Sequence, residues 1–179
     1  MTGMDAPPVI VLPDPCLVVL VGAAGSGKST FAARHFSPSE VLSSDAFRER
    51  VSGDPADQAA TGAAFAALHA ALSQRLRDRL LTVVDATSVQ AHARHQLTRR
   101  AAAAGVPAIA VVLDLPVTVV LERNAARSSR VVPEAAVRRQ LAELDRTLRT
   151  GRLETEPFAS VVRLGSVAAV DAARFARAS

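Results

Sequence analysis

The chain has 179 residues and a formal net charge of +4, from 21 Lys and Arg against 17 Asp and Glu. This length suits one domain with a substantial core, and a hydrophobic content of 49% disfavours a disordered protein. Its single cysteine, Cys16, excludes an internal disulfide, and the lack of a signal-like start or a membrane-length apolar run predicts a cytoplasmic protein outside the membrane.

Apolar runs predict strands, and apolar residues at helical spacing predict helices, in alternation along the chain. The expected strands cover residues 9–12, 17–21, 40–43, 81–84, 108–113 and 160–164. The expected helices cover residues 29–35, 45–51, 58–79, 89–104, 117–127, 133–149 and 167–177, the second with Ser44 or Asp45 as its N-cap. Buried-type strands that alternate with helices predict an α/β fold, with a central parallel sheet covered on both faces, in one domain spanning residues 1–179.

A phosphate-binding loop lies between the second expected strand and the helix after it. It fits G-x-x-x-x-G-K-[ST] at every fixed position, with Gly22, Ala23, Ala24, Gly25, Ser26, Gly27, Lys28 and Ser29. Glycines let the backbone approach phosphate oxygens, which consecutive amides and the helix N-terminus then bind. We expect Lys28 to reach the β- and γ-phosphates of ATP and the Ser29 hydroxyl to bind Mg²⁺, with Thr30 beside them.

The rest of the sequence favours a kinase among the proteins that carry such a loop. GTPases need a guanine-specificity segment N-K-x-D, and Lys28 is the only lysine of this chain. Motor and AAA-type ATPases are usually larger and work as rings or with partner domains. We therefore expect a P-loop kinase fold that acts on a small substrate or on an end group.

Two carboxylates and an arginine are candidates for the remaining parts of a kinase. Asp45 follows the strand at 40–43, at the sheet edge where the phosphate loop lies, and is the candidate base; helix capping is its structural alternative. Arg48 lies one helical turn further on, where it could contact the acceptor or the phosphoryl group. Asp85 ends an apolar strand, a pattern typical of a carboxylate that supports Mg²⁺, with capping of the next turn as the alternative.

An arginine-bearing lid is predicted over about residues 123–133. Arg123, Arg127 and Arg130 follow one another at spacings of four and three, which places them on one side of a helix and its frayed end. Such a helical lid would close its arginines over the ATP phosphates and exclude water. A solvated basic helix end is the structural alternative.

Five segments carry a likeness to a known family; the phosphate loop is shared by many families, whereas S-S-D-x-x-R, V-V-D-A-T and E-R-N-x-x-R are much more specific in combination. The five segments are LVVLVGAAGSGKSTFAARH (17–35), VLSSDAFRERV (41–51), DQAATGAAFAALHAALSQRL (57–76), LTVVDATSVQ (81–90) and VVLDLPVTVVLERNAARSSR (111–130). Together with the tail at 158–174, they resemble the kinase domain of bacterial polynucleotide kinase-phosphatase, an RNA end-repair enzyme. The resemblance implies transfer of the ATP γ-phosphate to a 5′-hydroxyl end of RNA or DNA.

The same resemblance implies roles for the candidate residues. Lys28 and Ser29 would handle phosphates and Mg²⁺, Asp45 would be the general base for the 5′-hydroxyl, and Arg48 would bind near the acceptor end. The lid arginines would be Arg123 and Arg130, with Arg127 alongside, while Asp85 lies in the acceptor-side segment. In that family a metallophosphoesterase and a nucleotidyltransferase-like domain usually follow the kinase, so we expect either a phosphatase- or ligase-type domain or partner outside this chain, or a free-standing kinase.

Direct signs of nucleic-acid binding are fewer. There is no aromatic stacking platform, and two arginine sets could track a phosphate backbone or lie on solvated helix faces: Arg75, Arg77 and Arg79, and Arg94, Arg99 and Arg100. The alternatives are a small-metabolite or antibiotic kinase, which differs only in its acceptor pocket, and a non-catalytic NTP-binding module. A toxin kinase acting on a sugar nucleotide is disfavoured by the motif set.

Overall fold

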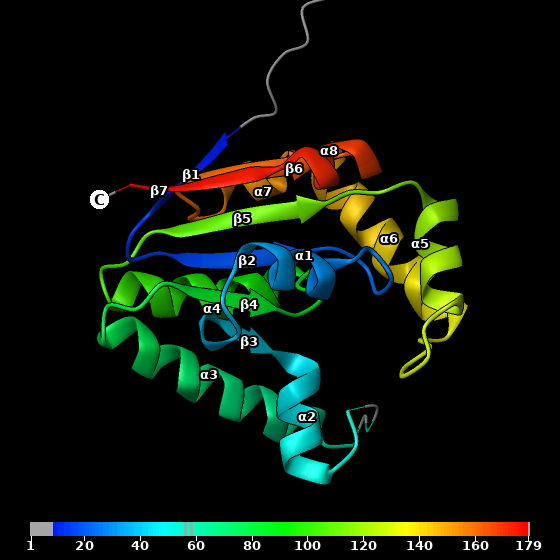
Figure 1. Ribbon diagram of the computed structural model, residues 1–179, viewed down its shortest axis with the longest axis horizontal. Coiled ribbons are helices and arrows are strands. Elements are labelled where there is room, and N and C mark those ends of the chain that lie inside the picture. The colour runs from blue at the N-terminus through cyan, green and yellow to red at the C-terminus, as the bar shows by residue number, and fades with distance from the viewer. Residues whose placement is uncertain (1–8, 56, 58, 179) are drawn as a thin grey trace, which may run out of the picture.

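A computed structural model of the chain describes residues 9–178 except 56 and 58. Its centre is a five-stranded parallel sheet in the order β3-β4-β2-β5-β6 (Figure 1). In that order the strands are Val41–Ser43, Thr82–Asp85, Leu17–Val21, Ala108–Leu113 and Ser160–Leu164. The predicted α/β fold with a central parallel sheet is confirmed.

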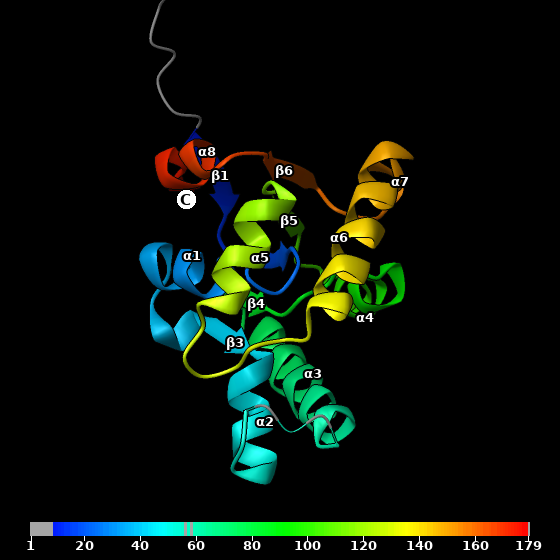
Figure 2. The ribbon, with the colours of Figure 1, turned by 90° about the vertical axis from the view of Figure 1, so that its right-hand side faces the viewer.

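Helices cover both faces of the sheet, as the apolar strands predicted (Figure 2). In β2, Val18 and Leu20 pack on one face, while Leu17, Val19 and Val21 pack on the other. The first face is covered by α1 (Lys28–His35) and α8 (Val167–Ala172). The second is covered by α3 (Thr61–Arg77), α4 (Ala91–Ala103), the later part of α6 (Glu134–Arg149) and α7 (Arg152–Thr155).

The C-terminal part of the expected helix at 167–177 is wrong. Helix α8 ends at Ala172, and Arg174–Ala178 form β7, which pairs in parallel with β1 (Val9–Pro13) as a separate two-stranded sheet. The alanine-rich sequence favours helix by propensity, but strand pairing and the packing of Phe175 against the rings of Phe31, His35 and Phe36 override it.

Other boundaries shift by a few residues. Helix α2 spans Ser44–Ser52 and is capped by Ser43, whose hydroxyl accepts from the amide of Ala46, so the predicted capping by Ser44 or Asp45 is wrong. Helix α3 begins at Thr61 instead of at residue 58, which lies outside the described residues. A short 3-10 helix, Pro38–Glu40, precedes β3.

Cys16 lies just before β2 and is fully buried. Burial, reinforced by the charge of Asp14, raises the pKa of its thiol to about 12. The thiol is therefore protonated at neutral pH and packs as a small apolar side chain. Over residues 9–178, leaving out 56 and 58, no helix has the length and apolar character needed to cross a bilayer.

The topology gathers the predicted site residues at one edge. All five strands of the main sheet run parallel, so their carboxyl ends lie together. The phosphate loop follows β2, Asp45 follows β3, and Asp85 is the last residue of β4, in register with Ser43. Helix α5 (Val117–Ala125) follows β5 and lies at the same end of the sheet (Figure 2).

Candidate active site

The phosphate loop takes a backbone conformation that its glycines make possible. Gly25 and Gly27 have φ angles of 86° and 91°, in the left-handed region. A Cβ on Gly25 would lie 2.5 Å from the carbonyl oxygen of Val120 in α5, so the loop packs directly on that helix. The amide of Gly22 donates to the carbonyl of Thr87 at 3.1 Å, which joins the start of the loop to the segment after β4.

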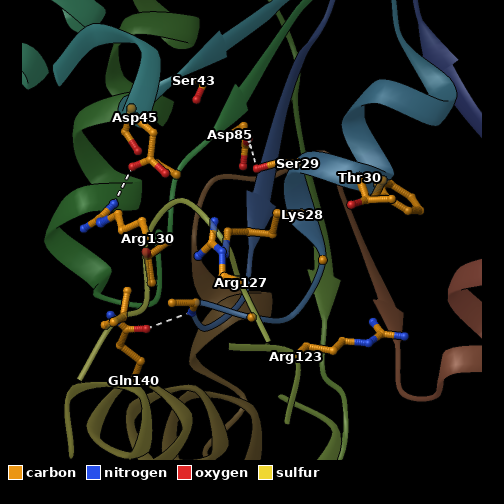
Figure 3. A pocket seen from close by; sticks show the side chains of 18 of the residues that line it. Lys28, Ser29, Thr30, Ser43, Asp45, Asp85, Arg123, Arg127, Arg130 and Gln140 are labelled. Atoms are coloured by element: carbon orange, nitrogen blue, oxygen red, sulfur yellow. Dashed lines mark hydrogen bonds and ion pairs between the residues drawn. The ribbon is translucent and has the colours of Figure 1, made fainter. Parts of the chain in front are cut away.

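A cavity of about 350 Å³ opens over this loop (Figure 3). It is lined by most of the predicted residues: Ala24, Gly25, Gly27, Lys28, Ser29, Thr30, Asp45, Arg48, Asp85, Arg123, Arg127 and Arg130. The other loop residues, Gly22, Ala23 and Ser26, lie behind it. Six cationic side chains line the cavity against three anionic ones, a balance that suits a polyanionic ligand such as a nucleoside triphosphate.

Lys28 is held beside the start of the loop. Its Nζ donates to the carbonyl oxygens of Gly22 at 2.8 Å and Ala23 at 3.0 Å. Burial lowers the pKa of Lys28 from 10.5 to about 8; the negative charge of Asp85 opposes this shift, and the guanidinium of Arg127 adds to it. An anion in the cavity would restore the charged form of this ammonium group.

Ser29 and Asp85 meet across the sheet edge. The Ser29 hydroxyl donates to Oδ2 of Asp85 at 2.7 Å, and the Asp85 side chain is buried (Figure 3). A hydroxyl and a carboxylate so close together are hard oxygen donors of the kind Mg²⁺ prefers. The pair therefore fits the predicted metal-supporting role.

Asp45 lies in the first turn of α2 with its carboxylate directed into the cavity (Figure 3). Its Oδ1 accepts hydrogen bonds from the guanidinium groups of Arg48 and Arg130. Because Ser43 caps the helix, the Asp45 carboxylate is not used as the N-cap and remains directed at the cavity. The side chain is 33% exposed, so water or a ligand can reach it.

Arg48 is fixed by several contacts despite its charge. Its Nε donates to the Thr61 hydroxyl at 3.3 Å, and its guanidinium lies 5.9 Å from the ring centre of Phe65 in α3. Burial lowers the pKa of Arg48 from its ordinary value, as does the neighbouring Arg130, while Asp45 opposes them. The Arg48 guanidinium is therefore already oriented at the cavity wall before an anionic acceptor binds.

The three lid arginines all line the cavity, but the lid is not helical as expected. Helix α5 ends at Ala125, so Arg123 lies on a helix whereas Arg127 and Arg130 lie on the following loop. Pro133 then precedes α6 and is its N-cap residue. Arg123 sits over the phosphate loop, since its Nη1 would be 3.4 Å from a Cβ on Gly27. We call residues 123–133 the lid segment.

Asn124 holds the two ends of the lid segment together through hydrogen bonds. The sequence did not predict this role. Its side-chain amide donates to the carbonyl of Val132 at 2.7 Å, and its side-chain oxygen accepts from the Val132 amide at 3.1 Å. Asn124 is 3% exposed, and its Cβ would be 2.9 Å from one added to Gly25. The signal lay in the segment E-R-N-x-x-R, in which Asn124 is the uncharged polar residue between Arg123 and Arg127 and lies on the buried side of the helix.

Gln140 is a second residue that the sequence analysis missed. It lies on α6, lines the cavity, and accepts a hydrogen bond from the amide of Ala24 in the phosphate loop at 2.9 Å (Figure 3). Apart from Thr147, it is the only uncharged polar residue of α6. No motif in the sequence connects that position to the phosphate loop, because the contact joins residues 116 positions apart.

The expected nucleic-acid arginines are partly engaged within the fold. Arg94 is fully buried and pairs with Glu156 at 2.5 Å, while its Nη1 donates to the carbonyls of Ser88 and Val89 at 3.0 and 2.7 Å. Arg75 donates to the Thr82 hydroxyl and to a neighbouring carbonyl, both at 3.0 Å. Arg75 and Arg94 therefore stabilise the fold. The interpretation of Arg94 as a residue that tracks a phosphate backbone is wrong, because it is fully buried.

Comparison with known proteins identifies the fold. Residues 17–147 match the protein-family model described as an AAA domain, a description that names no reaction. No curated protein matches the sequence. A chain in the structure of the Pnkp1/Rnl/Hen1 RNA repair complex is 23% identical with a TM-score of 0.65, over 78% of this chain and 47% of that one. This chain thus spans about half the length of that relative.

Two other kinases share the fold over most of their lengths. Gluconokinase from Sinorhizobium meliloti 1021 is 21% identical with a TM-score of 0.52, over 88% of this chain and 85% of its own. Shikimate kinase from Acinetobacter baumannii, in complex with shikimate, is 24% identical with a TM-score of 0.52, over 88% of each chain. The structure therefore has the fold of the P-loop kinases, which is shared by enzymes with different acceptors.

Proposed function

Because the chain belongs to the AAA-domain family that its residues 17–147 match, and has the P-loop kinase fold, we propose that it is an ATP-dependent polynucleotide 5′-hydroxyl kinase. One observation carries the proposal: the Asp45 carboxylate is ion-paired with Arg130 of the lid segment in the cavity that also contains Lys28. A carboxylate, a phosphate-binding lysine and additional cations over one cavity are the parts that phosphoryl transfer to a hydroxyl requires.

A polynucleotide acceptor is supported by the acceptor-side wall of the cavity. Ser43, Ser44, Asp45 and Arg48 line that wall, and they form the S-S-D-x-x-R segment on which the resemblance to polynucleotide kinase-phosphatase depends. The fold likeness to a chain of an RNA repair complex agrees with this choice. The acceptor end would then approach Asp45 from the side of α2.

The proposed reaction moves one phosphoryl group and one proton. The 5′-oxygen forms a bond to the γ-phosphorus while the bond between that phosphorus and the bridging oxygen of ADP breaks. The hydroxyl proton passes to the carboxylate of Asp45. Lys28 and the arginines of the lid segment would neutralise charge on the transferring oxygens, which is where this type of catalysis gains most of its rate.

Ser29 and Asp85 are the residues that would hold Mg²⁺, through the hydroxyl and carboxylate oxygens that lie 2.7 Å apart. When bound, this ion supplies neutralising charge to the phosphate oxygens. Asp85 would keep the Ser29 hydroxyl oriented towards the cavity in either state. Lys28 remains the protein's own cation at the phosphates.

The test is transfer of labelled phosphate from ATP to a 5′-hydroxyl oligonucleotide, as RNA and as DNA. Asp45→Asn should lower kcat by about 10²- to 10⁴-fold, the usual contribution of a general base, while ATP binding is retained. Asp114→Asn is the matched control, because Asp114 also follows an apolar strand but lies outside the cavity, paired with Arg163. Transfer that survives Asp45→Asn would remove the base assignment.

A small-metabolite kinase is the second candidate. It is favoured by the gluconokinase and shikimate kinase likenesses, which cover 85% and 88% of those chains, and by the engagement of Arg75 and Arg94 within the fold. The same assay with sugars, sugar acids and nucleosides as acceptors separates the two. Transfer to one of these and to no oligonucleotide would replace the polynucleotide proposal.

A further inference from the structure

Gln140 presents free hydrogen-bond donors to the phosphate cavity. A backbone amide can only donate, so the side-chain oxygen of Gln140 must be the atom that faces Ala24, and this fixes the orientation of the carboxamide. Its Nε2 group carries two N–H bonds, and among the described residues none accepts a hydrogen bond from it. Because Gln140 lines the cavity, these donors are available to a ligand there.

The position of Ala24 shows which part of a nucleotide these donors would meet. Lys28 extends back along the loop until its Nζ contacts the carbonyls of Gly22 and Ala23, the residues just before Ala24. In this type of loop the lysine head group binds the β- and γ-phosphates, whereas the amides cradle the α- and β-phosphates. The Ala23 carbonyl that Lys28 contacts and the Ala24 amide that Gln140 contacts belong to the same peptide group. Ala24 and Gln140 therefore lie beside the lysine head group, at the γ-phosphate end.

We infer that Gln140 is a catalytic residue whose Nε2 donates a hydrogen bond to an oxygen of the transferring γ-phosphoryl group. This rests on the proposed function only in so far as the chain binds ATP and transfers its γ-phosphate. Gln140 acts with Arg127 and Arg130, which line the same cavity from the lid segment. Unlike those arginines, it is anchored to the phosphate loop, so its position does not depend on the lid segment.

A purely structural role makes a different prediction. If Gln140 only held the loop through Ala24, any side chain that accepts the same hydrogen bond would replace it. Gln140→Glu is such a side chain, since a carboxylate also accepts from the Ala24 amide, but it removes both donors and adds a negative charge facing the γ-phosphate. Gln140→Met keeps the size and removes acceptor and donors together.

The experiment is calorimetric titration of the full chain with ADP and with a non-hydrolysable ATP analogue, both with Mg²⁺. Gln140→Glu should weaken binding of the ATP analogue by at least about tenfold, because a hydrogen bond to a charged oxygen is lost and a like charge is added. Its affinity for ADP should stay within about threefold of that of the unmodified chain. Gln96→Glu is the control, since it adds the same charge on the exposed side of α4.

The outcomes separate this inference from the proposed function. If Gln140→Glu binds both nucleotides like the unmodified chain, or Gln140→Met weakens both equally, Gln140 is structural and the inference is wrong. No acceptor is present, so failure to phosphorylate oligonucleotides does not affect the result. If the unmodified chain binds neither nucleotide, the inference and the proposed function both fail.

Discussion

The carboxylate of Asp45 accepts a hydrogen bond from the guanidinium of Arg130, which lies 85 residues later in the chain. This contact joins the wall formed by α2 to the lid segment across the cavity. The group proposed to accept the proton and a cation proposed to stabilise the phosphoryl group are therefore in direct contact. A γ-phosphate entering the cavity would compete with Asp45 for Arg130 and leave the carboxylate available to the hydroxyl.

The contact should be measurable as a coupling free energy. In a double-mutant cycle with Asp45→Asn and Arg130→Met, we expect the two effects on unfolding free energy to be non-additive by about 1 kcal/mol, as for partly buried charges in contact. The same cycle on Glu134 and Arg138, a more exposed pair on α6, should give no more than about 0.5 kcal/mol. Additive effects at Asp45 and Arg130 would show that the contact does not persist in solution.

The lowered pKa of Lys28 predicts proton uptake on nucleotide binding. With a pKa of about 8, Lys28 is mostly neutral at about pH 9 in the free protein, and a bound triphosphate favours its charged form. Binding should therefore take up close to one proton at about pH 9 and close to none at about pH 6.5, and affinity should fall as the pH rises above 8. Calorimetry in buffers of different ionisation enthalpy measures this.

The control for that measurement is Lys28→Arg, because a guanidinium keeps its charge at both pH values. Its affinity for nucleotide should be lower, since a planar group cannot reach both loop carbonyls and phosphates as an ammonium does. Its proton uptake at about pH 9 should vanish. Equal uptake by Lys28→Arg and the unmodified chain would assign the proton to another group.

Loss of the Asn124 side chain should loosen the lid segment. Asn124→Ala removes two hydrogen bonds to Val132 and leaves both backbone groups of that residue without these partners at a partly buried position. We expect a loss of about 1 to 3 kcal/mol in unfolding free energy and faster hydrogen exchange over residues 125–132. Gln96→Ala, which removes an exposed amide from α4, should change neither. Unchanged exchange at the lid segment in Asn124→Ala would contradict the closing role.

Breaking the buried ion pair of Arg94 and Glu156 should lower the free energy of unfolding more than breaking any surface ion pair would. Glu156→Gln leaves a fully buried guanidinium without its carboxylate, so we expect a loss of about 3 kcal/mol or more in urea unfolding. Asp114→Asn, which breaks the more exposed pair with Arg163, should cost less than about 1 kcal/mol. Similar costs for the two variants would mean that water reaches Arg94.

Local sequence signals predicted the parts of the fold that depend on neighbouring residues. The apolar runs located β2 and β5, because these two strands are buried along their whole length and carry only apolar residues. The loop motif placed Lys28 and Ser29, because phosphate binding needs those residue types at that spacing. The position of Asp85 at the end of an apolar strand predicted its place in the site, because β4 brings it to the same sheet edge as the loop.

What the sequence did not predict depends on contacts between distant residues. The strand at 174–178 has helix-forming alanines, and its pairing with β1 and the packing of Phe175 make it extended. The burial of Arg94 follows from Glu156, 62 positions away, and the role of Gln140 from Ala24. Arginine is so frequent here that its spacing alone cannot separate a phosphate ligand from a buried structural cation.

The pairing of β1 with β7 also bears on the order in which the protein can fold during synthesis. Val9 pairs with Arg174, so among the strands that the structure describes β1 has no partner until residues 174–178 have been synthesised. Until then the rings of Phe31 and Phe36 lack the cover that Phe175 provides. The main sheet can form first, since its last strand ends at Leu164, and this aromatic corner would be the surface that a chaperone meets on the nascent chain.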